Sequence, residues 1–440
     1  MHQPLELPSA VSTATNGPHP DKNVQEGGAP SETVATAQPD PPHLPVTTVP
    51  ALATEPRILD RLVMELRNSG VVGEARAAKL IYLLVTSRVL ERPISAVLKG
   101  PSSAGKNHNV ESILRLFPPS SYYALTAMSE RALAYSLEPL QHRVLVLYEA
   151  AGLRSDFGSY LIRSLLSEGR IRYETVETTK EGLRPRLIDK EGPTGLLITT
   201  TAIRLHPENE TRLLSIPLND TAQQTHRILK AMATEQGPKL DPTKWHALQD
   251  WIEKAEHRVT IPYALALAEA IPPVAVRLRR DFKTILNLIQ THAILHQATR
   301  DRDEQGRIIA TLGDYAVIRE LVADLIAEGL EASVPPVMRE TVQAVKDLKT
   351  ARKPVVNVTD VAAALNLDKS AALRRVRGAM KRGFLSNRNE KPGQPYDLAL
   401  GDPLPDDKVI LPTPECLSGC TVAGALGEGA PSSEETGGFV

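Results

Sequence analysis

GPSSAGKN, at residues 100–107, is the stretch that decides the fold of this 440-residue chain. Apolar residues 94–98 precede it and an amphipathic segment, 110–117, follows it, which predicts the order strand, loop, helix. Glycines at both ends let backbone N–H groups wrap a phosphate, and Lys106 adds positive charge. The spacing G-x-x-x-x-G-K predicts a nucleotide-binding loop. Its residues are Gly100, Pro101, Ser102, Ser103, Ala104, Gly105, Lys106 and Asn107.

The eighth position of the loop departs from the usual pattern. A Ser or Thr normally stands there and ligates Mg²⁺ through its hydroxyl, whereas this chain has Asn107. An amide oxygen is also a ligand for hard cations, so Asn107 remains a candidate for Mg²⁺. The alternative is a Gly/Ser surface turn that contains a lysine by chance. We favour nucleotide binding because the loop lies between a predicted strand and a predicted helix.

Composition places the chain among globular proteins. Its 440 residues are 42% hydrophobic and 23% charged, enough for two or three domains with a sizeable core. It contains no run of 18 apolar residues, and its first residues lack the apolar segment of a signal peptide. The two cysteines, Cys416 and Cys420, indicate neither a disulfide framework nor a zinc site. We therefore expect a cytoplasmic protein without a membrane partner.

The distribution of residue types predicts five regions in an α/β chain. Residues 1–55 are rich in Pro, Ser and Thr and predict a disordered arm. Residues 56–220 contain the loop and predict a nucleotide-binding core with a parallel sheet. Residues 221–337 are helical and predict a lid with extra helices. Residues 338–400 predict a small separate domain, and residues 401–440 a disordered tail.

A second buried strand ends in an acid. Residues 144–149, VLVLYE, form an apolar run that predicts a parallel strand delivering Glu149 to the edge of the sheet beside the phosphates. Such strands usually end in Asp-Glu, and here Tyr148 stands at the Asp position. We predict that Glu149 is the base that activates water and that it serves the metal together with Asn107. The alternative is an ordinary strand end.

Four more residues are candidates for contact with the nucleotide. Residues 195–201, GLLITTT, predict a strand whose end, at Thr200 and Thr201, reaches the γ-phosphate and its water, although Thr also favours strands for structural reasons. Arg212 precedes an apolar strand and fits an arginine finger that completes a neighbouring subunit's site. A surface ion pair is the alternative. Arg280 is our candidate for a lid arginine that reaches ATP.

Two basic elements are candidates for DNA binding. The first is a predicted hairpin with alternating residues on either side of a turn near 181–182, and acids dilute its charge, so a solvated hairpin is the alternative. The second lies in residues 338–400, whose helix–turn–helix order and two short strands resemble a winged-helix domain. The hairpin candidates are Arg170, Arg172, Arg184 and Arg186. The helix candidates are Lys369, Arg374, Arg375, Arg377, Lys381 and Arg382.

The local charge supports DNA contact by the second element. Between Lys349 and Lys391 there are eleven Lys or Arg residues against three acids, which the whole-chain net charge of −1 hides. Winged helices also serve as protein-interaction modules, which is the alternative here. In the helical region, His292 and His296 have i, i+4 spacing that could suit a metal, but no third ligand is evident, so packing is favoured.

Taken in order, these parts resemble an AAA+ ATPase. Residues 98–216 resemble the ATP-binding domain of helicase- or primase-associated proteins of bacterial mobile elements and phages, through LLSEGRIRYET (165–175), KEGPTGLLITTT (190–201) and HPENETRLLSI (206–216). The hairpin between the acid-ended strand and the next strand is similar, more distantly, to that of minichromosome-maintenance helicases.

The resemblance implies an oligomeric ATPase, a ring or hexamer, that uses ATP and Mg²⁺. It also implies action on DNA in replication or maintenance of a mobile element, with replication proteins as partners. Asn107 and Tyr148 depart from the pattern at the magnesium ligands. The alternative is therefore a non-hydrolysing, nucleotide-dependent DNA-binding adaptor, such as a helicase loader or regulator.

Overall fold

A five-stranded parallel sheet carries the loop. The computed structural model describes residues 48–129, 131–150, 156–180, 182–201, 210–218, 220–234, 240–389, 394–404 and 410–418. The order of the strands is β2-β3-β6-β1-β7, all parallel. Their bounds are β1 Ala96–Lys99, β2 Tyr122–Leu125, β3 Arg143–Leu147, β6 Thr194–Thr200 and β7 Leu214–Pro217. This confirms the predicted α/β fold.

The register of the sheet decides which residues meet. β6 lies between β3 and β1, with Leu147 opposite Ile198 and Leu98 opposite Thr199. The carboxyl ends of β1, β3 and β6 therefore lie side by side at one edge. In open parallel sheets, ligands bind outside that edge.

Helices cover both faces of the sheet, and the strands are apolar along their length because both faces are buried. Leu98 and Val146 belong to a core shared with the helices α1, α2 and α3, while Val97 and Leu145 belong to a second core on the other face. The second core includes residues of α4 and α5. The bounds are α1 Ile58–Asn68, α2 Ala75–Thr86, α3 Lys106–Leu114, α4 Ala132–Tyr135 and α5 Asp156–Glu168.

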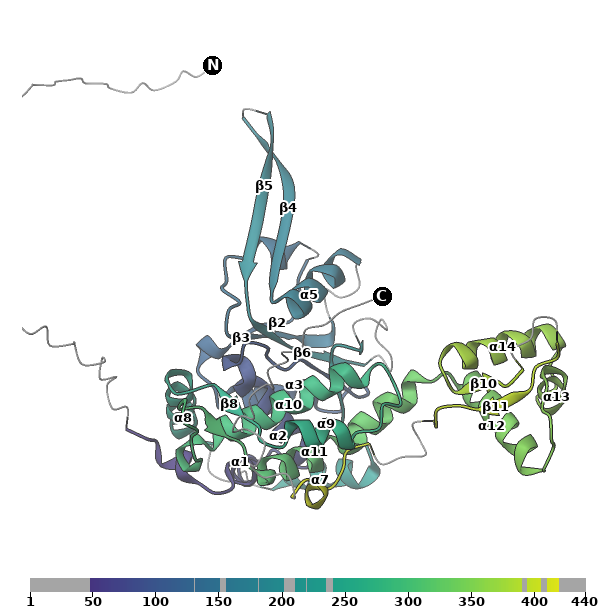
Figure 1. Cartoon of the computed structure of the whole chain (residues 1–440). Coiled ribbons are helices and arrows are strands. Elements are labelled where there is room, and N and C mark those ends of the chain that lie inside the picture. The colour runs from purple at the N-terminus through teal and green to yellow at the C-terminus, as the bar shows by residue number, and fades with distance from the viewer. Residues whose placement is uncertain are drawn as a thin grey trace, which may run out of the picture. The chain divides into compact units, whose positions relative to one another are not determined.

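A β-hairpin follows α5 and confirms the predicted alternation. β4 (Arg170–Thr179) pairs antiparallel with β5 (Gly182–Glu191) over ten residue pairs. Only its base enters the core: Ile171 and Ile188 are buried, and the rings of Phe157 and Tyr173 are 5.1 Å apart. Figure 1 shows the far half of this ribbon extending beyond α5.

The region after the sheet is almost wholly helical and shares the first core. Its helices are α7 Ala222–Ala233, α8 Thr243–Lys254, α9 Ala264–Ala270, α10 Leu278–Leu295 and α11 Leu312–Ser333. Two short strands, β8 (Val259–Thr260) and β9 (Ile308–Ile309), pair in parallel within it. No helix in the described part of the chain is long and apolar enough to span a membrane.

His292 of α10 and His296, the residue that caps the end of this helix, are both buried. His292 Nδ1 lies 2.6 Å from Asp314 Oδ1, and the ring of His296 lies 4.5 Å from that of His292. Asp314 also accepts from Arg300 at 2.5 Å and completes the capping box of α11 with Thr311. Among the described residues, no group of three or more His, Cys, Asp or Glu side chains is placed to hold a metal ion.

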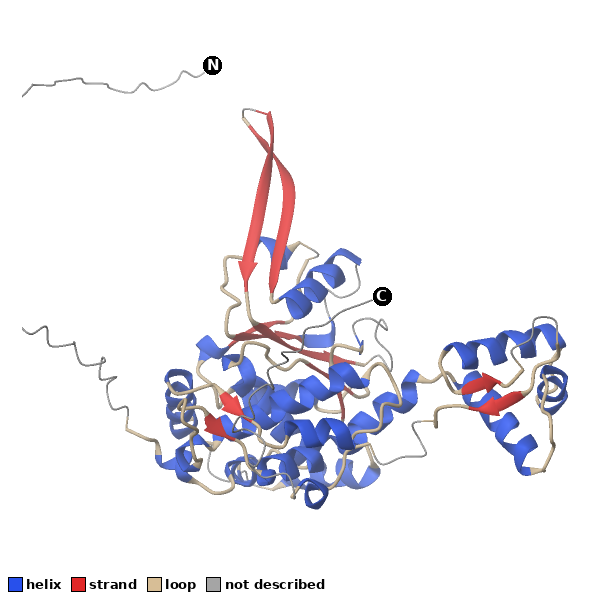
Figure 2. Cartoon of the chain, in the orientation of Figure 1, coloured by secondary structure: helices blue, strands red, loops and turns tan. Residues whose placement is uncertain are grey.

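A small domain of three helices and two strands follows α11 (Figure 2). Asn357 caps α13 in a capping box with Asp360, and Asp368 caps α14, because each side chain accepts from the first free N–H groups of its helix. Its core contains Val345, Val361 and others. The bounds are α12 Pro336–Thr350, α13 Val358–Ala364, α14 Lys369–Lys381, β10 Leu385–Asn387 and β11 Leu398–Leu400.

The expected terminal boundaries need correction. Residues 51–54, within the expected arm, form a 3-10 helix with Leu52 and Ala53 buried. Residues 410–418, within the expected tail, lie against α11 because Leu411 and Leu417 are apolar and find a place in the core. Residues 1–47, 405–409 and 419–440 lie outside the described residues. The remaining 3-10 turns are Ser87–Val89, Pro119–Ser121, Tyr148–Ala150, Gln297–Thr299 and Pro414–Leu417.

Candidate nucleotide site

The loop at residues 100–105 connects β1 directly to α3. Gly105 has φ +76°, in the left-handed region that glycine adopts without strain, and this turns the chain into the helix. Ser103 also has a positive φ, 68°. A side chain on Gly100 would contact the Cβ atoms of Ala104 and Leu218, both at 3.4 Å. These are ordinary van der Waals contacts, so the requirement for glycine in the loop comes from the positive φ of Gly105.

Lys106 lies across the loop. Its side chain is buried, and its Nζ donates to the carbonyl oxygens of Gly100 at 2.9 Å and Pro101 at 2.6 Å. Both acceptors are neutral, so the ammonium charge stays available to an anion in the loop. The start of α3 adds its own partial positive charge at the same place.

A buried threonine joins three elements at the carboxyl edge of the sheet. Thr199 of β6 is fully buried, and its Oγ1 accepts from the backbone N–H of Glu149 at 2.8 Å. The same hydroxyl donates to Oδ1 of Asn107 at 3.1 Å. One side chain thus ties the end of β3 to the first turn of α3. The two residues predicted to serve the metal, Asn107 and Glu149, are brought together by it.

The sequence pattern indicates the two residues after Thr199, Thr200 and Thr201, as the candidates for contact with the γ-phosphate. Thr200 is buried, and its carbonyl oxygen accepts from the N–H of Gly100 at 3.3 Å, while Thr201 is exposed just after β6. The signal for Thr199 is its register, because it lies opposite Leu98 on the P-loop strand. That register cannot be read from the run GLLITTT alone.

Glu149 has an unusual backbone. Its φ is 59° and ψ 27°, the left-handed conformation that a residue with a side chain adopts at a cost of about 1 kcal/mol. Its side chain is exposed. Before it, Tyr148 is buried, and burial together with the charges of Glu111 and Tyr122 raises the pKa of Tyr148 to about 12. Tyr148 therefore stays protonated and cannot replace the missing carboxylate.

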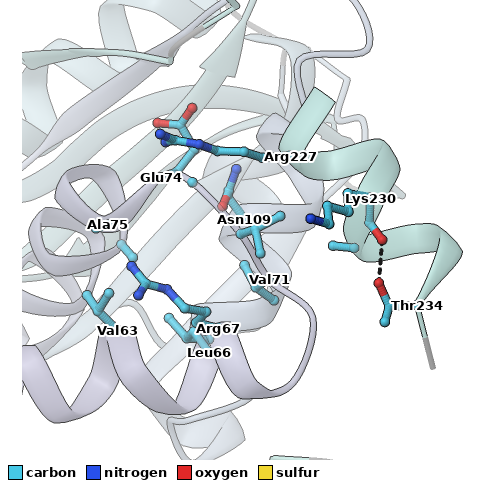
Figure 3. Close-up of a pocket in the computed structure, with 14 residues that line it drawn as sticks. Val63, Leu66, Arg67, Val71, Glu74, Ala75, Asn109, Arg227, Lys230 and Thr234 are labelled. Carbon is cyan, nitrogen blue, oxygen red and sulfur yellow. Dashed lines mark hydrogen bonds between the residues drawn. The ribbon is translucent and has the colours of Figure 1, made fainter. Parts of the chain in front are cut away.

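A cleft of about 600 Å³ lies beside α3, the helix that follows the loop (Figure 3). Asn109 lines it and also donates to the carbonyl of Gly105 at 3.1 Å, so the cleft and the loop share α3. Arg227 and Lys230 line it from α7. The remaining lining comes from α1, α7 and residues 71–78. Sequence reasoning missed this cleft because its walls are far apart in the chain.

Arg212 and Arg280 meet at one turn before β7. Arg212 Nε donates to Ser167 Oγ of α5 at 2.9 Å, and Arg280 Nη1 donates to Thr211 Oγ1 at 2.6 Å. Glu210, in the same turn, forms an ion pair with Lys99 at the end of β1. The turn is thus held by residues on three other elements. Finger and lid roles for these arginines remain predictions.

The predicted DNA-binding residues fall into two groups. On the hairpin, Arg172 lies 3.7 Å from Asp189 and Arg186 lies 2.6 Å from Glu177, so acids partly neutralise them. Arg170 and Arg184 are exposed, as are Lys369 and Arg382 at the ends of the α14 stretch.

On α14 the basic residues point in different directions. Arg374, Arg377 and Lys381 are exposed at i, i+3, i+7 spacing and form one face. Arg375 points elsewhere, since its Nη1 lies 3.1 Å from Glu340 of α12. The basic surface of α14 is therefore the face that carries Arg374, Arg377 and Lys381, and not the whole helix.

The loop, the parallel sheet and the site at its carboxyl edge define a P-loop domain. Residues 57–247 match a family model described as the MTBMA_p00010 P-loop domain. No curated protein matches the chain. Among solved structures, the chain is similar to a full-length MCM homolog from Methanopyrus kandleri, with 13% identity and a TM-score of 0.42. That match covers 61% of this chain and 59% of the homolog, about three fifths of its length.

Proposed function

We propose that the chain is a nucleoside triphosphatase that binds ATP in the loop at residues 100–107. The observation that carries the proposal is the bridge from Asn107 through Thr199 to Glu149 beside the buried Lys106. A phosphate-binding loop, a cation, a metal-capable amide and a carboxylate are the parts that phosphoryl transfer to water needs. The family model, which is described as a P-loop domain, agrees with this assignment.

Each residue has a separate role in the proposed reaction. Loop N–H groups and Lys106 bind the β- and γ-phosphates. Asn107 and Glu149 would hold Mg²⁺, which neutralises phosphate charge when it is bound. The carboxylate of Glu149 accepts a proton from water as the water oxygen attacks the γ-phosphorus and the bond to the β–γ bridging oxygen breaks. Thr199 does not touch substrate; it positions Glu149 and Asn107.

The nucleoside would lie in the cleft beside α7. Its volume of about 600 Å³ is in the range of small-molecule sites. Asn109 lies at its junction with the loop, and Arg227 and Lys230 add positive charge from α7. Val71 and Leu66 supply apolar wall for a base. A nucleotide so placed would contact both the P-loop helix and the first helix after β7.

We propose further that ATP use is coupled to DNA, in an oligomer of a ring or hexamer type, during replication or maintenance of a mobile element. Support comes from the basic face of α14 and from the cations of the hairpin. The second candidate is an adaptor that binds nucleotide without hydrolysis. It is favoured by one specific observation, that a tyrosine, Tyr148, stands where a metal-binding carboxylate would be expected.

Nucleotide binding and hydrolysis are tested separately. Lys106→Ala should weaken ATP affinity, measured by calorimetry, because the charge beside the terminal phosphates is removed. Glu149→Gln should bind ATP normally but hydrolyse it about 100-fold more slowly or worse, since an amide cannot accept the proton. Glu320→Gln, an exposed residue of α11, is the matched control and should leave both properties unchanged. Wild-type protein that binds ATP without turnover, with or without DNA, would establish the adaptor instead.

A mixing experiment tests the proposed finger. Arg212→Ala should bind ATP and lose turnover. Mixing it with Glu149→Gln should restore part of the activity, because some interfaces then contain both intact residues. Proven co-assembly without any rescue would assign Arg212 a structural role through Ser167.

A further inference from the structure

One face of the hairpin is exposed along its length, and no described residue packs against it. Paired residues of an antiparallel ribbon share a face, so the register assigns ten residues to this one. All ten are exposed. We call it the outer face: Arg170, Arg172, Glu174, Val176, Thr178, Leu183, Pro185, Leu187, Asp189 and Glu191. The inner face holds Ile171, Tyr173 and Ile188, which pack toward α5 and the second core.

The far half of the outer face is apolar. Val176, Leu183 and Leu187 are 61%, 74% and 50% exposed, and Pro185 stands beside them opposite Val176. An isolated two-stranded ribbon is only marginally stable in water, and contiguous exposed apolar side chains mark interaction sites. A partner that binds this face would therefore stabilise the ribbon and also bury its exposed apolar side chains.

The charges on the outer face favour a protein partner over a polyanion, because its acids, Glu174, Asp189 and Glu191, outnumber its two arginines. The apolar half carries no cation, and Glu174 lies at its edge. Nearer the base, Arg172 is 3.7 Å from Asp189, and Arg170 lies opposite Glu191. Cations on this face thus each stand beside an acid. The net positive charge of the ribbon is on the inner face, where Arg184, Arg186 and Lys190 outnumber the single acid Glu177.

We propose that the outer face packs against the outer face of a second copy of this chain. The outer face is complementary to itself about a two-fold axis parallel to the ribbon. This axis places β4 of one copy over β5 of the other. Each residue then faces the residue of the second copy that corresponds to its own cross-strand partner. Arg172 then lies over Asp189 of the second copy, Arg170 over its Glu191, and Val176 over its Pro185. Cation meets acid at the two levels nearest the base and Val176 meets Pro185, while Leu187 faces Glu174 and Leu183 faces Thr178 at the two remaining levels. The contact is isologous, as two-fold interfaces are.

The contact is small, so it is weak when it acts alone. Ten residues at a strand rise of about 3.4 Å give a ribbon about 34 Å long and two strands wide. Such a face is well below the area of a stable protein–protein interface. Pairing is therefore concentration-dependent and leaves the cationic inner face accessible. This inference does not depend on ATP hydrolysis.

Site-directed cross-linking tests the geometry in the full chain. Val176→Cys and Pro185→Cys proteins, carrying different tags and lacking Cys416 and Cys420, are mixed and treated with a short bis-maleimide. Packed sheets are about 10 Å apart, within reach of the reagent. We expect a cross-linked heterodimer. The matched control mixes Glu177→Cys with Arg184→Cys, a directly paired position on the inner face, and should cross-link much less.

Sedimentation equilibrium tests the energetics. Val176→Lys with Leu183→Lys should raise the dissociation constant at least about tenfold. Thr175→Lys, on the inner face of the same strand, should leave it unchanged, and equal melting temperatures exclude misfolding. The proposal is overturned if both faces cross-link equally or if no heterodimer forms. It is also overturned if the Val176→Lys, Leu183→Lys variant has the same dissociation constant as the wild type. It is also overturned if the lysine variant changes DNA affinity instead, which would make the face a nucleic-acid surface.

Discussion

At the scale of single residues, Thr199 makes the arrangement of the site depend on one hydroxyl group. It is fully buried, accepts from Glu149 N–H and donates to Asn107 Oδ1. Thr199→Val keeps the shape and removes both bonds, so the N–H of Glu149 and Oδ1 of Asn107 each lose this partner. We expect the free energy of unfolding to fall by about 1–3 kcal/mol, measured in denaturant. ATP turnover should fall more than ATP affinity.

Thr199→Ser is the control for that substitution. It keeps the hydroxyl and should recover most of the turnover, although it loses a buried methyl group. A purely structural role would instead make the loss of activity follow the loss of stability in both variants. Equal turnover by the Val variant and the wild type would remove Thr199 from the site.

His296 makes the stability of the helical region depend on pH. Burial, then the nearby His292 and Arg300, lower its pKa to about 3, while Asp314 acts in the opposite direction. The unfolded chain binds a proton near the ordinary pKa of about 6.5, so it binds more protons than the folded chain between these values. The contribution of His296 to the free energy of unfolding is therefore largest above pH 6.5. Below that pH the free energy of unfolding falls by up to about 1.4 kcal/mol per pH unit.

The pH dependence is measured as unfolding free energy between pH 7.5 and pH 5. His296→Gln should flatten the profile, whatever it does to stability at pH 7.5. His226→Gln, an exposed histidine of α7, should leave the slope unchanged. Burial alone would raise the pKa of Asp314, but hydrogen bonds from His292 and Arg300 hold it well below its ordinary range, so Asp314 adds no slope in this window. A wild-type profile that is flat from pH 7.5 to 5 would contradict the assignment.

The residues of the loop could be predicted because they form a local sequence pattern. Thr199 could not, because its role depends on how the strands are ordered in the sheet. Gly100, Gly105 and Lys106 follow one another at a fixed spacing, and their roles come from backbone conformation and charge. Thr199 looks like any β-forming threonine in the sequence. Its role depends on β6 lying between β3 and β1, which is decided by the packing of the whole sheet.

At the scale of elements, α14 presents its charges in two directions. Arg374, Arg377 and Lys381 share the exposed face. Replacing these three with Ala should weaken DNA binding and lower the slope of log affinity against log salt by about three units, since fewer counterions are released. Basal ATP turnover should persist. Affinity measured across a salt series checks this, and an unchanged slope would make the small domain a protein-interaction module.

Arg375→Ala is the control within the same helix. Its partner is Glu340 on α12, so its loss should leave the salt slope nearly unchanged. The sequence could not distinguish Arg375 from its neighbours, because all are basic residues of one predicted helix. Arg375 differs from them because α12 packs beside α14 and brings Glu340 within reach of Arg375. Sequence patterns predicted the hairpin well, since alternation is local, but which of its faces stays uncovered depends on α5.

At the scale of the whole molecule, the chain returns to α11 after the small domain. Tyr315 Oη donates to the carbonyl of Pro412 at 2.7 Å, and Arg319 Nε donates to that of Leu411 at 3.1 Å. Polar, Pro-rich composition led us to expect no structure from 401 onward. A few apolar residues suffice to anchor such a segment when a helix presents partners for them, and here that helix, α11, lies about a hundred positions earlier in the chain.

This anchor should contribute to the stability of the P-loop domain as a whole, because Leu411 is 1% exposed and belongs to the same core as β1 and α2. Leu411→Ala should lower the free energy of unfolding by about 2–5 kcal/mol, through lost burial and the cavity left behind. Cys416→Ser, at an exposed position of the same segment, should change it little. DNA affinity should be retained in both, since α14 is untouched. If Leu411→Ala unfolds like the wild type, residues 410–418 are not anchored in solution, and the small domain is tethered to α11 at one end only.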